Sequence, residues 1–285
     1  MPDRIELALH DVLARAAEGA PARLTAALRH AVFPGGARVR PQLCQAVAAA
    51  CGDDAPALTD AASAALELLH CASLVHDDLP CFDDASLRRG RPAVHRAHGE
   101  AMAVLAGDAL IVLAFEALAT AKGPAARVAK LVAAFARAAG TPYGLVAGQA
   151  WESERGAPLE RYHRAKTGSL FVAAVSAGAL SAGHDPAPWQ AVGDCLGRAY
   201  QLADDLLDVC ATPAEAGKPT GQDWRAGRPN AVFHLGVHGT VTQLRELVAA
   251  AAAAVPACAG ADALRALVFR TSERLVPAAL KQTAA

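Results

Sequence analysis

Two acidic clusters, each at the end of an apolar segment, most constrain how this chain can fold. The first lies in residues 74–90, which read Leu-Val-His-Asp-Asp-Leu-Pro-Cys-Phe-Asp-Asp-Ala-Ser-Leu-Arg-Arg-Gly. The second, residues 204–208, reads Asp-Asp-Leu-Leu-Asp. Either cluster alone could be a solvated helix end, because acidic runs are common on protein surfaces. Two such clusters, one followed at once by Arg-Arg-Gly, indicate instead that the rest of the chain is a scaffold that brings them face to face.

The acidic side chains have the chemistry and spacing of a magnesium site. Mg²⁺ prefers oxygen ligands and usually binds through one or two carboxylates together with the phosphates of a substrate. Asp204 and Asp208 are four residues apart and share one helix face. Asp77 and Asp83 would lie roughly 9 Å apart along a continuous helix, although Pro80 is expected to kink or end that helix.

The composition favours an all-α protein with a single domain. The chain has 285 residues, of which 53% are hydrophobic and 5% aromatic. Ala and Leu are strong helix formers, and the alternating pattern typical of strands is scarce. No internal repeat or linker divides the sequence, so we expect one domain over residues 1–285. The net charge of −1 provides no basic surface for nucleic acid.

The cysteines and the apolar segments indicate a cytoplasmic protein. The seven cysteines are scattered and form no Cys-x-x-Cys, which is typical of reduced thiols. Residues 1–6 are charged and contain no apolar signal segment. Residues 167–184 lack Asp, Glu, Lys and Arg, but this segment is near the lower length limit for a membrane span. We interpret it as a buried core helix and expect no membrane span.

Several basic residues lie where an anion could bind. Arg38 and Arg40 follow a pair of glycines. This segment is either a solvated turn or an anion site, because Arg binds phosphate through two donors at once. His70 lies seven residues before Asp77, so both can occupy one helix face. Lys166 enters an apolar run and either snorkels to solvent or faces an anion.

The two acidic motifs together resemble the polyprenyl synthetase family of trans-isoprenyl diphosphate synthases. The first motif has the form Asp-Asp-x₄-Asp with Arg-Arg-Gly behind it, and the second has the form Asp-Asp-x₂-Asp. The resemblance extends from Gly35 to about Asn230, and residues 70–84 are especially similar to bacterial geranylgeranyl diphosphate synthases of carotenoid pathways. It implies an all-α barrel of long helices around a deep apolar cavity, the isoprenoid synthase fold, usually as a homodimer.

The resemblance also implies roles for individual residues. About three Mg²⁺ ions would bind the allylic diphosphate and would be held by Asp77, Asp83 and Asp204. Asp78 and Asp208 would support this metal site. Arg88 would contact the same diphosphate. Isopentenyl diphosphate, the second substrate, would bind Arg40, His70 and Arg89. The cleft near the departing group would be lined by Lys166, Thr167, Gln201 and Lys218, of which Lys166, Thr167 and Lys218 are the catalytic candidates.

These residue types fit a reaction in which an allylic C–O bond breaks to give a carbocation and a diphosphate. Metal ions and Lys or Arg side chains stabilise the negative charge that grows on the leaving oxygen. A dry apolar cavity protects the cation from water. The double bond of isopentenyl diphosphate then attacks, and the family's usual proposal is that the released diphosphate takes the proton.

The length of the product is expected to depend on residues below the first acidic cluster. Ser73 and Ala72 lie four and five residues before Asp77, and both are small. Farnesyl-forming relatives tend to place a large aromatic residue near this position. Its absence leaves room for another five-carbon unit, with Leu69 and Leu68 as candidates for the floor about one turn deeper. We therefore expect a 20-carbon product, geranylgeranyl diphosphate.

One residue departs from the family pattern, and three alternatives stay open. Ala37 stands where a Lys usually follows the glycine pair, and the loss of that cation would weaken binding of isopentenyl diphosphate by about 1–3 kcal/mol. The alternatives are a farnesyl diphosphate synthase, a terpene cyclase, and a non-catalytic partner subunit of a heteromeric synthase. A second diphosphate site argues against the cyclase, and both intact aspartate motifs argue against the partner subunit.

Overall fold

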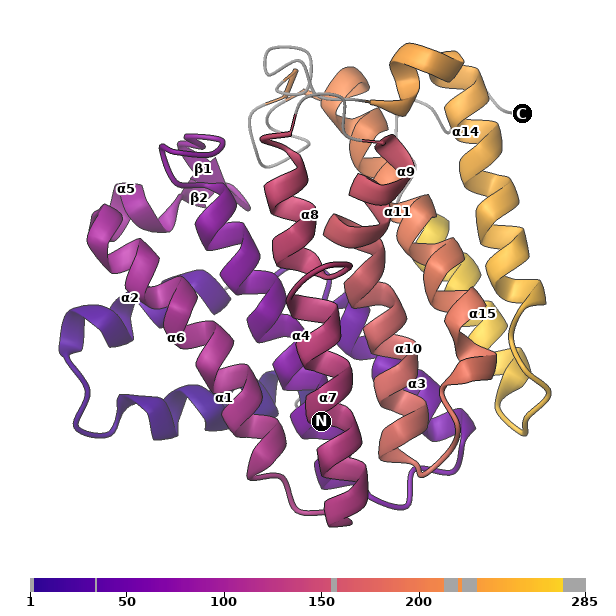
Figure 1. The fold of residues 1–285 in the computed structure, drawn as a ribbon, viewed down its shortest axis with the longest axis horizontal. Coiled ribbons are helices and arrows are strands. Elements are labelled where there is room, and N and C mark those ends of the chain that lie inside the picture. Colours follow the sequence, from indigo (N-terminus) through magenta and orange to yellow (C-terminus); the bar gives the residue numbers. More distant parts are fainter. Residues whose placement is uncertain (1–2, 34, 155–157, 213–219, 222–229, 274–285) are drawn as a thin grey trace.

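The computed structural model describes residues 3–33, 35–154, 158–212, 220–221 and 230–273. These residues are mostly helical, which confirms the predicted all-α class (Figure 1). The helices in chain order are α1 (Arg4–Ala17), α2 (Ala22–Val32), α3 (Val39–Ala50), α4 (Pro56–Asp77), α5 (Val94–His98), α6 (Glu100–Ala119), α7 (Ala125–Ala139), α8 (Leu145–Trp151), α9 (Leu159–His163), the π-helix η1 (Arg164–Gly168), α10 (Ser169–Ser181), the 3₁₀-helix η2 (Ala187–Trp189), α11 (Gln190–Cys210), α14 (Ala231–Ala253) and α15 (Ala261–Glu273). A short hairpin, β1 (Leu87–Arg88) and β2 (Arg91–Pro92), follows α4.

The central helix is α4, which carries the first acidic cluster at its end. It begins at Pro56, whose missing N–H is not needed in the first helical turn. It ends at Asp77, because Pro80 disfavours helical geometry in the residue before it. α4 packs against α3, α6 and α10. By length and composition α4 could span a membrane, but 78% of its apolar window is buried inside the protein, as in the core helix of a large domain.

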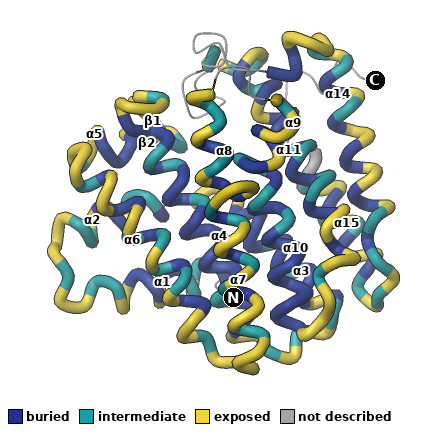
Figure 2. The backbone as a smooth tube through the Cα atoms, viewed as in Figure 1, coloured by how far each residue is buried: buried dark blue, intermediate teal, exposed yellow. Residues whose placement is uncertain are grey.

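The second core helix is α10, which is buried along almost its whole length (Figure 2). Glycines let its neighbours approach closely. A Cβ on Gly178 would lie 2.4 Å from the carbonyl oxygen of Cys44 in α3, and a Cβ on Gly193 of α11 would lie 2.7 Å from the Cα of Val172. The uncharged segment of residues 167–184 therefore contains a core helix, as expected.

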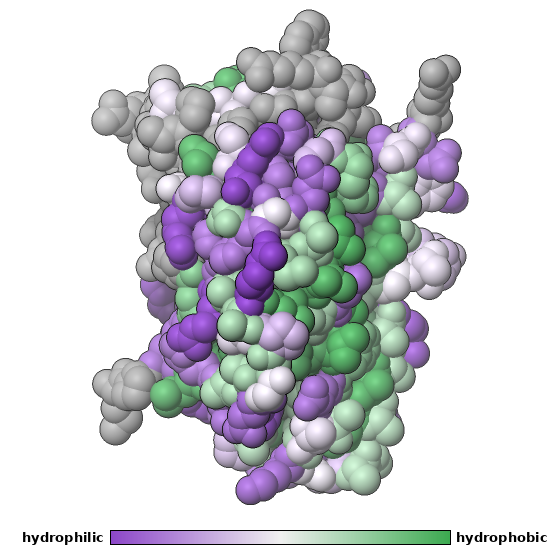
Figure 3. Space-filling model, turned by 90° about the vertical axis from the view of Figure 1, so that its left-hand side faces the viewer, coloured by the Kyte–Doolittle hydropathy of each residue, from purple (hydrophilic) through white to green (hydrophobic). Residues whose placement is uncertain are grey.

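The apolar helix α6 is only partly buried. It too could span a membrane by length and composition, and 39% of its apolar window is buried. Val104, Leu105 and Val112 are 42%, 49% and 65% exposed. Figure 3 shows apolar residues gathered in a band along this side of the molecule. Contiguous exposed apolar surface of this kind usually marks a contact surface.

Two helix boundaries differ from those that the sequence indicates. A helix is expected to start at Thr141-Pro142, but residues 141–144 form a turn and α8 begins at Leu145. One continuous helix is expected from Pro158 through Lys166, but the chain forms α9 and then the π-helix η1. A π-turn inserts an extra residue into a helix and is frequent at functional sites.

Candidate active site

The two acidic clusters line one pocket of about 400 Å³ between the C-terminal ends of α4 and α11. Eleven of the site residues that the sequence predicts line it, namely Arg40, His70, Ser73, Asp77, Asp83, Arg88, Lys166, Thr167, Gln201, Asp204 and Asp208. The scaffold thus brings residues that are far apart in the sequence to one place. Their roles in binding and catalysis stay predictions.

Five predicted residues do not line this pocket, and one lies outside the described residues. Leu68, Leu69 and Ala72 are fully buried in the hydrophobic core. Asp78 and Arg89 lie beside a small neighbouring cavity instead. Lys218 belongs to the part of the chain that the structure does not describe.

The first cluster sits on a tight turn rather than on a continuing helix. The backbone N–H of Asp83 donates to the carbonyl oxygen of Asp77 at 2.9 Å, so the turn folds back on the end of α4. The spacing along a continuous helix therefore does not apply. The Asp77 carboxylate accepts from Gln149 Nε2 at 2.9 Å, and Lys166 Nζ lies 3.5 Å from its other oxygen.

Asp78 contacts Arg88 and does not face the pocket. The Arg-Arg-Gly motif forms a two-residue hairpin turn, in which Arg89 and Gly90 have φ angles of 53° and 73°. A type I′ turn requires positive φ at both positions. The turn directs Arg88 toward Asp78, which accepts from Arg88 Nε at 3.0 Å and from Nη2 at 2.5 Å. Asp78, which is expected to support the metal site, orients Arg88, and Arg88 lines the pocket.

A buried carboxylate that sequence reasoning missed determines where two other arginines point. Glu67 lies 2.6 Å from Arg38 Nη1 and 3.5 Å from Arg89 Nη2. Arg38 also donates to Glu6 at 2.7 Å. Although burial disfavours the charge, Glu6 and Glu67 raise the pKa of Arg38 above its ordinary value. Arg38 is therefore neither a solvated turn residue nor a pocket residue. The sequence signal for Glu67 is a single carboxylate within the apolar run of α4.

Arg40 and His70 both line the pocket. Arg40 supplies a cationic hydrogen-bond donor, and His70 supplies a neutral imidazole. The Arg40 guanidinium carbon lies 4.7 Å from the ring centroid of Phe171 and 5.7 Å from that of Tyr200. Its Nε is buried without a hydrogen-bond partner in the described part of the chain. Burial, together with Arg40 and Arg89, holds the pKa of His70 well below its ordinary value. A buried guanidinium without a carboxylate partner is suited to bind an anion.

Lys166 is held over the first cluster by Glu152, which sequence reasoning also missed. Lys166 Nζ donates to Glu152 Oε1 at 2.6 Å, and the Tyr162 hydroxyl donates to the same oxygen at 2.7 Å. Burial disfavours the charge on Lys166, but Asp77, Tyr162 and Glu152 more than offset this and raise its pKa above the ordinary value. A Cβ on Gly148 would lie 2.2 Å from the Lys166 backbone nitrogen, so α8 can approach η1 only because residue 148 is glycine.

In the second cluster, the outer aspartates line the pocket and the middle one is structural. Asp205 is buried and accepts from the backbone N–H of Ala231 at 2.8 Å and from Gln201 Nε2 at 2.9 Å. Gln201 in turn accepts from Thr167 Oγ1 at 2.6 Å. A carboxylate at a helix N-terminus is stabilised by the backbone N–H groups and the helix dipole. Asp205 therefore fixes the start of α14 and orients Gln201 and Thr167 on the pocket wall.

The carboxylates fit an open magnesium site rather than a closed one. Across the described ranges, no three His, Cys, Asp or Glu side chains converge closely enough to hold a metal ion by themselves. Mg²⁺ usually keeps waters and substrate phosphates among its ligands and is seldom held by an all-protein cage. Carboxylates on the pocket walls with Arg40, Arg88 and Lys166 nearby are therefore suited to a magnesium–diphosphate complex.

Comparison with known proteins points to one family. The family description Polyprenyl synthetase matches residues 21–260. The geranylgeranyl diphosphate synthase of Cereibacter sphaeroides is 52% identical over 277 residues, and the alignment covers 96% of both chains. That of Rhodobacter capsulatus is 48% identical and covers 93% of this chain and 92% of the relative. A solved geranyltransferase from Helicobacter pylori, complexed with magnesium and isoprenyl diphosphate, has a TM-score of 0.80 at 29% identity over 88% of each chain.

Proposed function

The chain belongs to the polyprenyl synthetase family, and we propose that it condenses isopentenyl diphosphate with an allylic diphosphate to give geranylgeranyl diphosphate. The observation that carries this proposal is the pocket that both acidic clusters line together with Arg40, Arg88 and Lys166. A short-chain prenyltransferase needs such a site, because it must hold two diphosphates and stabilise the negative charge that forms on one of them. The two relatives that share about half of their residues with this chain support the 20-carbon product.

The residues on the pocket walls divide into two groups. Asp77, Asp83, Asp204 and Asp208 would hold Mg²⁺ on the allylic diphosphate, where the metal supplies stabilisation of the charge on the leaving oxygen. Arg88 and Lys166 add positive charge beside the first acidic cluster. On α3 and α4, Arg40 and His70 would bind isopentenyl diphosphate, so that its double bond faces the allylic carbon. Thr167 and Gln201 complete the wall near the departing group, and the released diphosphate takes the proton.

The test is a turnover assay on the purified protein alone. Labelled isopentenyl diphosphate is incubated with Mg²⁺ and allylic primers of five, ten and fifteen carbons, and the products are sized. We expect a 20-carbon diphosphate that disappears when Mg²⁺ is chelated. A 15-carbon end product would indicate a farnesyl diphosphate synthase. Turnover of an allylic diphosphate without isopentenyl diphosphate would indicate a cyclase, and no turnover would indicate a partner subunit.

The close approach of α8 to η1 gives a testable prediction about Lys166. Gly148→Ala places a Cβ against the Lys166 backbone, and overpacking of this kind costs about 1–3 kcal/mol. We expect kcat to fall about tenfold or more, because Lys166 moves relative to Asp77. Steady-state kinetics and urea unfolding measure the two effects. Gly168→Ala is the matched control, since its Cβ would meet only ordinary contacts, the nearest at 3.7 Å. Equal losses in both variants would contradict the prediction.

We propose that the exposed apolar face of α6 is the contact surface of a homodimer. Val104, Leu105 and Val112 recur at helical spacing on this face, and an exposed apolar face gains stability when a second copy covers it. The double variant Leu105→Arg/Val112→Arg is expected to be monomeric by size-exclusion chromatography with light scattering. Leu7→Arg, on the exposed side of α1, is expected to remain dimeric. A monomeric wild-type chain that binds lipid vesicles through α6 would overturn this assignment.

The chain is further proposed to act as a single cytoplasmic domain. The buried apolar side chains form one cluster that extends from α1 to α15, which supports one domain over residues 1–285. All seven cysteines are free thiols, as is usual in a reducing compartment.

A further inference from the structure

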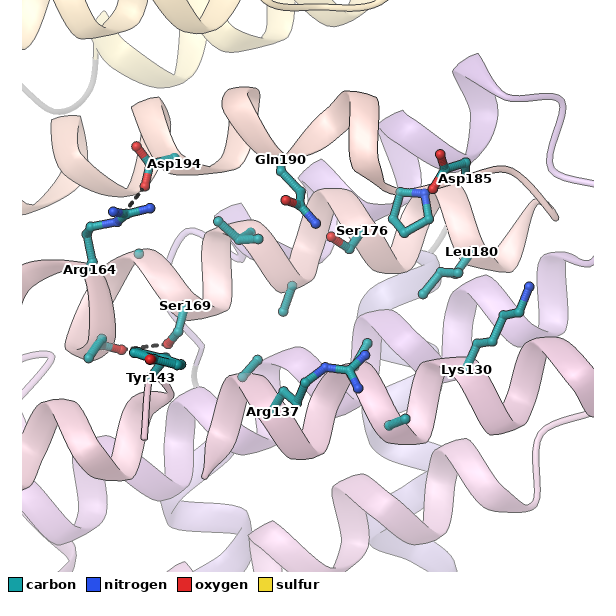
Figure 4. Close-up of a pocket in the computed structure, with 18 of the residues that line it drawn as sticks. Lys130, Arg137, Tyr143, Arg164, Ser169, Ser176, Leu180, Asp185, Gln190 and Asp194 are labelled. Atoms are coloured by element: carbon teal, nitrogen blue, oxygen red, sulfur yellow. Dashed lines mark hydrogen bonds and ion pairs between the residues drawn. The ribbon is translucent and has the colours of Figure 1, made fainter. Parts of the chain in front are cut away.

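A second and larger cavity is an open groove of about 1460 Å³ along α10, with α7 on one side and α11 on the other (Figure 4). Arg161 of α9 and the first residues of η1 close one end of it, and residues 183–186 close the other. The groove shares no lining residue with the pocket that holds the acidic clusters. It is therefore a separate site for which the proposed reaction has no use.

The walls of the groove carry an excess of positive charge. Arg127, Lys130 and Arg137 lie three and seven residues apart on α7 and so share one helix face. Arg161 and Arg164 lie at the end of the groove that α9 and η1 form. Two of these five cations form ion pairs with carboxylates, Arg127 with Asp54 and Arg164 with Asp194.

The remaining three cations have no carboxylate partner among the residues that the structure describes. Lys130, Arg137 and Arg161 form no ion pair within the described ranges of the chain. Figure 4 shows Lys130 and Arg137 reaching from α7 toward α10. Besides Asp194, the carboxylate of Asp185 also lines the groove. Positive charge on its walls therefore still exceeds negative charge and would attract a multiply charged anion.

The floor of the groove is apolar and has one buried hydroxyl. α10 contributes Val172, Ala173 and Leu180, and α7 contributes Ala134 and Ala138. Ser176 is 7% exposed and lines the groove. In Figure 4 the Ser176 side chain points into the groove. A floor of small apolar residues leaves room for a long hydrocarbon chain.

We propose that this groove binds one molecule of a prenyl diphosphate, the class of product that the proposed function supplies. Lys130 and Arg137 hold the diphosphate, and the isoprenoid chain lies along α10 against Val172, Ala173 and Leu180. Both parts of the ligand are required, because a polar phosphate ester would leave the apolar floor in water and an uncharged lipid would leave the cations unpaired. This inference rests on the proposed function for the identity of the ligand and concerns a different site.

Equilibrium dialysis with labelled geranylgeranyl diphosphate in the presence of Mg²⁺ tests the proposal. The wild-type chain is expected to bind two molecules per chain, one in each site. Lys130→Ala/Arg137→Ala is expected to bind at the groove at least tenfold more weakly, so that one molecule remains, while turnover stays within twofold of the wild type. Lys122→Ala/Arg245→Ala removes the same charge from exposed positions outside the groove and is expected to bind two molecules.

A second variant tests the apolar floor. Ala134→Trp fills the groove without changing its charge and is expected to abolish the second binding event. Inorganic diphosphate is expected to bind the groove at least tenfold more weakly than geranylgeranyl diphosphate, because it cannot use the floor.

Four results would overturn the proposal. The first three are a single bound molecule in the wild type, equal binding in the Lys130→Ala/Arg137→Ala variant, and inorganic diphosphate bound as tightly as the prenyl diphosphate. Cosedimentation with phosphatidylglycerol vesicles that depends on Lys130 and Arg137, without a second prenyl diphosphate site, would make the groove a lipid surface and also overturn it. Turnover by the wild type in the same preparation distinguishes failure of the groove from failure of the proposed function.

Discussion

Asp77→Asn is expected to lower kcat/KM about 10³-fold, equivalent to about 4 kcal/mol of transition-state stabilisation, while the helical fold stays intact. Asparagine has the size of aspartate and can still accept the hydrogen bond from Gln149 Nε2. It removes the negative charge that lies 3.5 Å from Lys166 Nζ and that is proposed to bind magnesium. Lys166 retains its contact with Glu152, so the cation does not become unpaired.

The measurement is steady-state kinetics with isopentenyl diphosphate and an allylic primer over a range of Mg²⁺ concentrations. Circular dichroism and thermal unfolding establish that the variant is folded. Asp262→Asn is the matched control, because this aspartate is fully exposed and pairs with Arg265 on the same helix. We expect the control to keep wild-type turnover. If Asp77→Asn kept more than a tenth of the wild-type kcat/KM, Asp77 would not be part of the metal site.

The sequence was sufficient to predict the fold class and the convergence of the two acidic clusters. α4 illustrates why, because its apolar run, its Pro start and the proline after Asp77 are all local signals that determine where a helix begins and ends. The i, i+4 spacing of Asp204 and Asp208 likewise survives in α11, since both line the same pocket. Helical periodicity therefore carries over directly into the placement of pocket residues.

The sequence could not show how side chains point where the helix has ended. Asp77 and Asp78 are neighbours, yet only Asp77 lines the pocket, because the turn after α4 directs Asp78 toward the hairpin. The positive φ angles of Arg38 and Arg89 have the same kind of effect and bring both arginines to Glu67. Backbone turns outside regular structure depend on contacts that no local pattern encodes.

The other site residues that the sequence did not reveal make contacts with residues distant in the chain. Glu152 reaches Lys166 across fourteen residues, and Gln149 reaches Asp77 across 72. Neither residue belongs to a motif, and each contact depends on the packing of α8 against η1 and α4. Sequence reasoning detects such residues only when their partners are already known to be close in space.

Ser73→Phe is expected to change the main product from 20 to 15 carbons. Ser73 lies one helical turn before Asp77 on the same face of α4 and lines the pocket. A phenylalanine side chain at this position would extend into the space below the first acidic cluster and block the last five-carbon addition. The substitution removes only a local hydrogen bond, from Ser73 Oγ to the carbonyl oxygen of His70. Product sizing after incubation with labelled isopentenyl diphosphate is the measurement.

We choose Ser73 because it lines the pocket. Ala72 and Leu69, which are also expected to control chain length, do not. Both are packed in the core, so Ala72→Phe is expected to destabilise the fold by about 1–3 kcal/mol through overpacking. Ser73→Ala is the matched control and is expected to leave the 20-carbon product unchanged. A folded Ser73→Phe variant that still made mainly 20-carbon product would show that the growing chain does not pass Ser73.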